Sequence, residues 1–330
     1  MKELDPASLD CLAALADEVS FERAAQRLAV TQSAVSQRLR ALEAAVGAPL
    51  VVRSRPLRLT DPGKVLLRYA RQWHAMRADL ARELGEGLAG DERLSIAVNA
   101  DSLATWVPPA LDGLVQQGLD RGYGFELVVD DQDFTHEWLR QGAVLGCVST
   151  VREALRGCRV MPLGVMHYTA VASPGFVERW LPQGLTRANF AQLPFLVFNR
   201  KDDMQTQWVS RAFGVRGPRL RARYVPASEA YLRAAEMGWG IGVVPELQAR
   251  EALRAGRLQA LHPEVQLPVA LYWHQWQVDA PSDSPSPRLA LLDRVGMALA
   301  AGARQALAPQ RARAGGAPRA KSQRDKGSRG

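Results

Sequence analysis

Apolar residues recur at helical spacing in three successive segments near the start of the chain, at residues 8–18, 21–28 and 32–46. In the third segment they recur at intervals of three and four, at Val35, Leu39, Leu42 and Val46. Thr31 precedes this run and can accept a hydrogen bond from a first-turn N–H, and Gly47 suits the left-handed residue that ends a helix. The pattern predicts three short helices that share one apolar core.

Two further elements are expected before residue 90. Residues 48–60 read as two short extended segments around a tip at 54–56, which predicts a hairpin-like wing with several arginines. Pro62 suits the first turn of a helix, and a long helix follows with one apolar stripe, formed by Leu66, Tyr69, Trp73, Met76 and Leu80. The stripe either packs on its own domain or forms a dimer seam. We favour the seam, because the small neighbouring domain cannot cover it.

The composition shifts to glycine and charge around Ala89, where we place a domain boundary. Beyond it, apolar runs alternate with helical segments such as residues 102–116 and 229–237. The predicted strands are residues 94–98, 125–129, 144–149, 168–173, 195–198, 241–245 and 269–273. This alternation favours an α/β fold with mostly parallel sheets and room for two lobes, behind an all-α N-terminal part. The predicted divisions are residues 1–60, 61–89, 90–301 and a disordered basic tail at 302–330.

Charge changes this picture in two places. The 330-residue chain has a formal net charge of +8, of which +7 lies in residues 302–330, so the remainder is nearly neutral. Within that remainder, residues 23–71 carry a net +8, and they coincide with the predicted helices and wing. A basic zone of this kind is typical of a nucleic-acid interface.

Several other classes of protein find little support. The three cysteines are scattered without metal-ligand spacing, and four of the histidines, His136, His167, His262 and His274, lie far apart in sequence. We therefore expect no metal, no cofactor and no catalytic site. Acidic residues interrupt the N-terminal segment, and no apolar run is long enough to span a membrane, so we expect a cytoplasmic protein.

The three helices and the wing together predict a winged helix-turn-helix, whose third helix enters the major groove of double-stranded DNA. From Thr31 onward, the first turns would bring polar side chains to the base edges, namely Gln32, Ser33, Ser36 and Gln37. Four arginines would hold phosphates, namely Arg38, Arg40, Arg53 and Arg55. The alternative is a solvated polar face. Spacing, cap, turn and wing all agree with DNA binding, which we therefore favour.

The stretch "FERAAQRLAVTQSAVSQRLRALEAAVGAPLVVR" resembles the N-terminal signature of LysR-type transcriptional regulators. Further along, "LSIAVNADSLATWVPPAL", "DDM", "SEA" and "LYWH" resemble the ArgP branch of that family, also called LysG or IciA, which regulates arginine and lysine export. The resemblance runs from about residue 9 to 300. It implies a homodimer or homotetramer, a dimerising linker helix and a two-lobed effector domain similar to periplasmic binding proteins.

The same resemblance implies a small-molecule effector, lysine or arginine, in the cleft between the lobes. The residues carried over by this resemblance are Asn99, Asp101, Ser102, Asp131, Asp202, Asp203, Ser228 and Glu229. Carboxylates suit a cationic side chain, and N–H groups at a helix start suit an α-carboxylate. Each acid taken alone has an alternative reading as a helix cap or a solvated side chain.

We therefore predict a DNA-binding regulator that senses a basic amino acid and controls transcription, with an amino-acid exporter as its target. One rival is a replication-origin or nucleoid-binding protein without an effector role. Another is an enzyme or transport receptor built on the α/β lobes, which the helix-turn-helix opposes.

Overall fold

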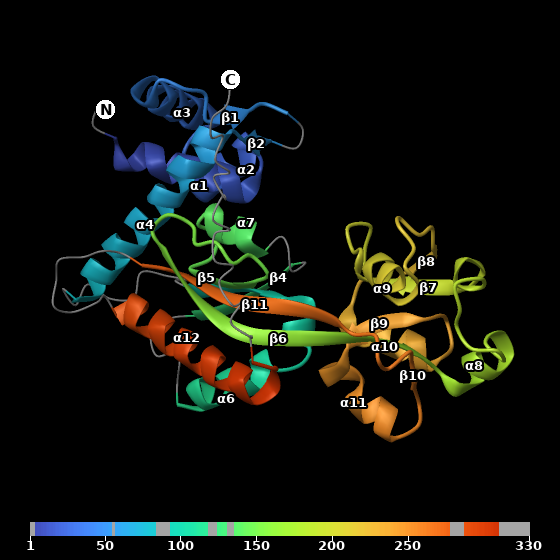
Figure 1. Cartoon of the computed structure of the whole chain (residues 1–330). Helices are drawn as coiled ribbons and strands as arrows, with labels where there is room; N and C mark the ends of the chain where they lie inside the picture. Colours follow the sequence, from blue (N-terminus) through green and yellow to red (C-terminus); the bar gives the residue numbers. More distant parts are fainter. Residues whose placement is uncertain are drawn as a thin grey trace, which may run out of the picture.

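A computed structural model describes residues 4–54, 57–83, 93–117, 124–130, 135–277 and 287–309. Arg55, Asp131 and residues 310–330 lie outside these ranges. Figure 1 shows an N-terminal helical unit, a connecting helix and a two-lobed α/β part crossed by two long strands.

The N-terminal unit contains the three predicted helices, α1 (Pro6–Glu18), α2 (Phe21–Arg27) and α3 (Gln32–Val46). The predicted cap of α3 is present, because the Thr31 hydroxyl accepts a hydrogen bond from the Ala34 N–H at 3.2 Å. Gly47 ends the helix in the left-handed conformation, with a φ of 78°. Apolar faces of all three helices share one core.

The predicted wing and long helix are also present. Strand β1 (Val51–Val52) pairs antiparallel with β2 (Arg58–Leu59), and α4 (Asp61–Glu83) follows at once. The first turns of α4 bury Leu66, Leu67 and Ala70 in the core of the N-terminal unit.

Lobe I consists of β3 (Arg93–Asn99), α5 (Ala100–Leu103), α6 (Val107–Gln116), β4 (Gly124–Asp130), α7 (Thr135–Arg140), β5 (Gly146–Ser149) and α12 (Pro287–Ala306). Lobe II consists of α8 (Pro174–Trp180), η1 (Phe190–Gln192), β7 (Pro194–Val197), α9 (Met204–Phe213), β8 (Arg221–Tyr224), α10 (Ser228–Glu236), β9 (Gly242–Pro245), α11 (Glu246–Arg254) and β10 (Gln259–Leu261). Strands β6 (Cys158–Ala172) and β11 (Leu267–Trp276) run through both lobes (Figure 1).

The main sheet is mixed, which corrects the expectation of mostly parallel sheets. Its strand order is β10-β6-β11-β5-β3-β4, with β9 also paired to β6. Strand β3 is parallel to β4 and β5, and β7 is parallel to β8, but β6 and β11 are antiparallel to each other and to their other neighbours. The apolar run at 168–173 marked only the end of β6. The first half of that strand is less buried and contains Pro162 and Gly164, so its apolar pattern is weak.

Two other boundaries differ from the prediction. The single helix expected at 102–116 is divided into α5 and α6, and Pro108 and Pro109 occupy the start of the second, where proline is tolerated. The disordered tail does not begin at 302, because α12 continues to Ala306 and Ala308 pairs with Val165 of β6. The small side chains of α12 allow this helix to pack closely on lobe I, where Ala303 is fully buried.

Candidate functional site

The polar face of α3 is presented outward, as the reading-helix hypothesis requires. Val35, Leu39 and Leu42 are buried beneath the helix. Five of the predicted contact residues are exposed, namely Thr31, Gln32, Ser33, Gln37 and Arg40, and Ser36 is half-buried beside them. A row of amide, hydroxyl and guanidinium groups therefore lies on one accessible helix face.

The arginines predicted to hold phosphates do not all point towards the exposed face. The Arg38 guanidinium is turned towards α1, with Nη1 4.0 Å from the Cys11 Sγ atom, instead of lying on the exposed face with Arg40. Arg53 is exposed on the wing, and its guanidinium carbon is 5.5 Å from the centroid of the Phe21 ring in α2. Arg58 is also exposed on β2, a basic residue that the sequence analysis did not single out.

A pocket lies between the two lobes, at the carboxyl ends of strands β3, β7 and β9, the usual place for ligands in an open α/β sheet. Its lining comes from Asn99, Ala100, Asp101, Tyr168, Phe198, Asp202, Met204, Ser228, Tyr231, Val243, Val244, Pro245 and Gln248. Four of the predicted effector residues are thus brought together, namely Asn99, Asp101, Asp202 and Ser228. Asp131 lies outside the described residues.

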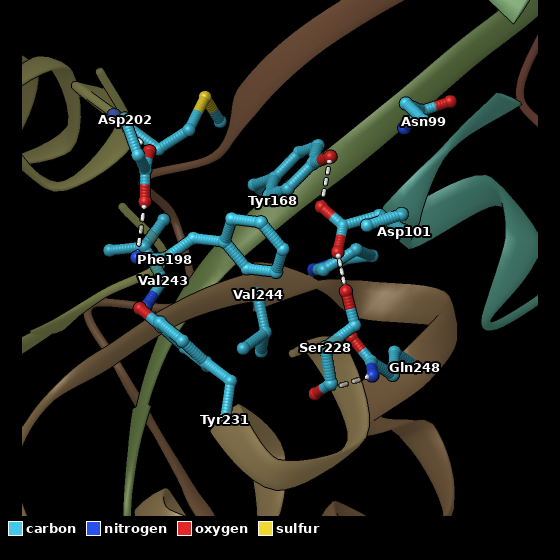
Figure 2. A pocket seen from close by; sticks show the side chains of 13 residues that line it. Asn99, Asp101, Tyr168, Phe198, Asp202, Ser228, Tyr231, Val243, Val244 and Gln248 are labelled. Carbon is cyan, nitrogen blue, oxygen red and sulfur yellow. Dashed lines mark hydrogen bonds between the residues drawn. The ribbon is translucent and has the colours of Figure 1, made fainter. Parts of the chain in front are cut away.

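Asp101 connects the lobes. Its carboxylate accepts one hydrogen bond from the Tyr168 hydroxyl at 2.7 Å and another from the Ser228 hydroxyl at 2.8 Å. Asp101 belongs to lobe I, Tyr168 to the crossing strand β6, and Ser228 to the first turn of α10 in lobe II (Figure 2). Both donors are neutral hydroxyl groups, and the carboxylate lines the pocket between the lobes.

Asp202 is held more firmly by its own lobe. Its carboxylate accepts hydrogen bonds from the Phe198 N–H at 2.9 Å, the Met204 N–H at 3.0 Å and the Gln205 amide at 2.9 Å. These contacts organise the start of α9, which agrees with the alternative reading of Asp202 as a capping residue. It still adds a second negative charge, on the opposite side of the pocket from Asp101 (Figure 2).

Asn99 supplies an acceptor without a partner. The residue is only 3% exposed and lines the pocket, and no donor among the described residues bonds to its Oδ1 atom. An acceptor in this position can take a hydrogen bond from a group that enters the pocket. Among the described residues that line the pocket, none is Lys, Arg or His, so the site is acidic.

Three predicted effector residues do not reach the pocket lining. Asp203 and Glu229 are exposed, and Asp203 accepts a hydrogen bond from Gln207 at 2.7 Å. Ser102 is fully buried behind the lining, and its hydroxyl has no hydrogen-bond partner among the described residues. Each of the three is adjacent in sequence to a lining residue. Consecutive side chains on a helix point in different directions, so the neighbour does not reach the pocket.

Several lining residues were not predicted from the sequence, among them Tyr168, Phe198, Tyr231 and Gln248. The hydroxyl of Tyr231 makes its hydrogen bonds within lobe II. It donates to the Leu196 carbonyl at 2.7 Å and accepts from the Val243 N–H at 3.2 Å. Burial raises the pKa of Tyr231, so it stays neutral near pH 7. Tyr231 therefore shapes the wall of the pocket.

Two of the sequence-distant histidines meet in lobe I. The ring centroids of His136 and His274 are 5.0 Å apart, and burial lowers the pKa of both. In the described part of the chain, no three His, Cys, Asp or Glu residues are grouped to hold a metal ion. None of the described helices has the length and apolar content needed to cross a membrane.

Comparison with known families covers both parts of the chain. Residues 6–64 match the model "Bacterial regulatory helix-turn-helix protein, lysR family", and residues 89–283 match "LysR substrate binding domain". The HTH-type transcriptional regulator ArgP of Aeromonas salmonicida is 43% identical over 284 residues, covering 84% of this chain and 93% of that protein. LysG of Mycobacterium tuberculosis (strain ATCC 25618 / H37Rv) is 41% identical over 280 residues, covering 84% and 90%.

Solved structures of similar proteins agree. The crystal structure of ArgP from Mycobacterium tuberculosis matches 93% of this chain and 100% of its own, with a TM-score of 0.77 and 38% identity. Full-length LysG from Corynebacterium glutamicum with the bound effector Arg matches 92% and 100%, with a TM-score of 0.67 and 34% identity. The chain therefore belongs to the LysR family of DNA-binding transcriptional regulators, a family of proteins that are not enzymes.

Proposed function

We propose that this regulator binds arginine or lysine in the pocket between its lobes and, in response, alters transcription of an exporter of basic amino acids. One observation carries the proposal: the pocket contains two carboxylates on opposite sides and, among the described lining residues, no basic side chain. Arginine and lysine carry two cationic groups separated by an aliphatic chain, so their charge complements this lining. The LysG structure with bound Arg supports the same ligand class.

Each group of such a ligand has a counterpart in the pocket. Asp101 offers a carboxylate to one cation, and Asn99 Oδ1 can accept a hydrogen bond from an ammonium or guanidinium N–H. The first turns of α5 and α10 lie beside Asp101 and Ser228, and neither helix has a side-chain cap on its N–H groups. Such N–H groups suit the α-carboxylate of the ligand.

A thermal-shift experiment tests the ligand class. Arginine or lysine at about 100 times its dissociation constant should stabilise the folded protein by about 2.7 kcal/mol and raise the melting temperature. Leucine and glutamate should give no shift, because the first lacks the second cation and the second adds charge of the wrong sign. Absence of any shift with both basic amino acids would refute the ligand but not the family.

For DNA binding, we propose that Gln37 reads a base and that Arg53 contacts a phosphate. Gln37→Ala should cost about 1–3 kcal/mol on the cognate site and relax base preference there. Arg53→Ala should weaken binding to all DNA sequences alike. It should also reduce the steepness of the plot of log binding constant against log salt concentration by about one. Binding assays in a salt series check both changes, and indifference of the cognate site to the two variants would remove these residues from the interface.

We also propose that α4 forms the seam of a homodimer. Its outward face carries an apolar stripe that consists of Val65, Tyr69, Trp73, Met76 and Leu80, each at least 43% exposed. Contiguous apolar surface of this kind marks a protein interface. Leu66, which the sequence pattern placed in the stripe, lies in the core instead.

A charge placed in this stripe should dissociate the dimer. Met76→Glu should lower the sedimentation coefficient to that of a smaller assembly, because it buries an unpaired carboxylate in the seam. Arg77→Gln is the matched control, since it changes the net charge by the same amount at an exposed neighbouring position. If both variants sediment like the parent protein, α4 does not form the seam.

A further inference from the structure

Helix α4 has a third face besides its buried core face and its exposed apolar stripe. This face carries three basic residues at helical spacing, Lys64, Arg68 and Arg71, and it lies against lobe I of the same chain. In Figure 1, α4 descends from the helical unit to lobe I and passes beside α7. Helix α4 therefore contacts both the N-terminal unit and lobe I.

Arg71 connects α4 with both lobe I and the N-terminal unit. Its Nη1 atom donates a hydrogen bond to the main-chain carbonyl of Gln141 in lobe I at 3.1 Å. The same guanidinium pairs with the carboxylate of Asp17 in α1, and Asp17 also accepts a hydrogen bond from Arg27 of α2 at 2.9 Å. One half-buried side chain thus ties lobe I to α1 and, through Asp17, to α2.

Arg68 and Gly142 bring the two backbones together. The Arg68 guanidinium carbon is 5.2 Å from the ring centroid of Trp276, a buried residue at the end of β11. Gly142 has a φ of +66°, and a Cβ atom there would stand 2.9 Å from the Cα atom of Arg68. Glycine is required at this point both for its backbone conformation and for the close approach.

Helix α7 connects this contact to the effector pocket. Glu137 in α7 is 3.9 Å from the Lys64 ammonium, and Gln141 and Gly142 follow α7 directly. On its other side, α7 is the element that succeeds β4, and β4 ends at Asp130, the strand partner of the pocket residue Asn99. Helix α7 also packs directly against β3, the strand that ends at the pocket residue Asn99. The element that contacts α4 therefore contacts a strand that reaches the pocket.

From these contacts we infer that Glu137, Gln141, Gly142 and Trp276 form a docking surface on lobe I for the chain's own α4, and that this contact transmits effector binding to the DNA-binding unit. The inference rests on the proposed effector function. An effector alters DNA binding only when its affinity differs between two arrangements of the protein, here α4 docked and α4 released. The expected coupling between arginine and operator is about 5- to 150-fold.

The first test measures that coupling in the full-length protein. Operator dissociation constants are determined with and without arginine, for the parent protein, Arg71→Gln, Gly142→Ala and the control Arg77→Gln. The two docking variants alter the contact from opposite sides, whereas Arg77 lies exposed on the same helix. The ratio of the two constants should fall towards one in both docking variants and stay at the parent value in the control. Calorimetry should show that all four proteins bind arginine, with a shifted affinity in the two docking variants and the parent affinity in the control, because arginine discriminates between the docked and released arrangements.

The coupling result can overturn the inference. If Arg71→Gln and Gly142→Ala bind arginine normally and keep the parent ratio, the contact does not transmit the signal. If the parent protein binds no arginine, the proposed effector function fails on its own, and the docking surface is then judged by a second readout.

That readout is the distance between spin labels at Glu22→Cys in α2 and Arg152→Cys in lobe I, both at exposed positions. A docked α4 gives one narrow distance distribution in the ligand-free protein, and Arg71→Gln or Gly142→Ala broadens it. A distribution that is already broad without either substitution would show that α4 is not docked.

Discussion

Asp101→Asn is expected to weaken arginine binding about 10- to 150-fold, because a hydrogen bond to a charged group contributes about 1.5–3 kcal/mol. Asparagine keeps the shape of the side chain and one oxygen acceptor, so the fold of the lobes is retained. What is lost is the negative charge that Asp101 contributes to the pocket lining, where a cationic group of the ligand would bind.

Calorimetry on the full-length protein measures this effect. Asp203→Asn serves as the control, since it removes the same charge from an exposed residue outside the pocket lining. Equal arginine affinity in Asp101→Asn and the parent protein would exclude Asp101 from the effector site.

Leu39→Ala should destabilise the DNA-binding unit by about 2–5 kcal/mol and abolish operator binding at growth temperature. Leu39 is 1% exposed and lies at the centre of the buried face of α3, so the truncation leaves a cavity under the reading helix. Effector binding should persist, because the lobes have their own cores.

Arg40→Ala, at the neighbouring position, distinguishes the loss of a DNA contact from the loss of stability of the DNA-binding unit. Arg40 is exposed on the outer face, so its loss should lower DNA affinity without lowering the melting temperature of the unit. The measurement is thermal unfolding alongside operator binding for each variant. A Leu39→Ala protein that melts and binds like the parent would show that the α3 stripe is not essential to the core.

The N-terminal unit could be predicted from sequence because each of its elements is amphipathic and carries its own end signals. The stripe of α3, its Thr31 cap and its Gly47 stop all appear as expected, and so does the wing. In the α/β part, short apolar runs marked where strands pass through the core but not how long they are. Strand β8 is exposed along its whole length, so it has no apolar run to detect.

The candidate pocket could be predicted only in part, and the family resemblance contributed more than the local pattern. Asn99, Asp101, Asp202 and Ser228 follow strands or begin helices, as ligand-binding residues in open α/β sheets commonly do. Tyr168 lies inside a strand and reaches the pocket only because β6 crosses from one lobe to the other. Pairing of His136 with His274 likewise depends on tertiary packing, since 137 intervening residues separate the two rings.

The most direct test of the account is a genome-wide map of binding sites for this protein in cells grown with and without added arginine. An effector-controlled regulator should occupy a small set of promoter sites, one of them beside a gene for an amino-acid exporter, and occupancy or transcription at these sites should change with arginine. The rival role in chromosome organisation predicts many AT-rich sites scattered across the chromosome. A scattered map that is indifferent to arginine would contradict the proposed effector-controlled regulator.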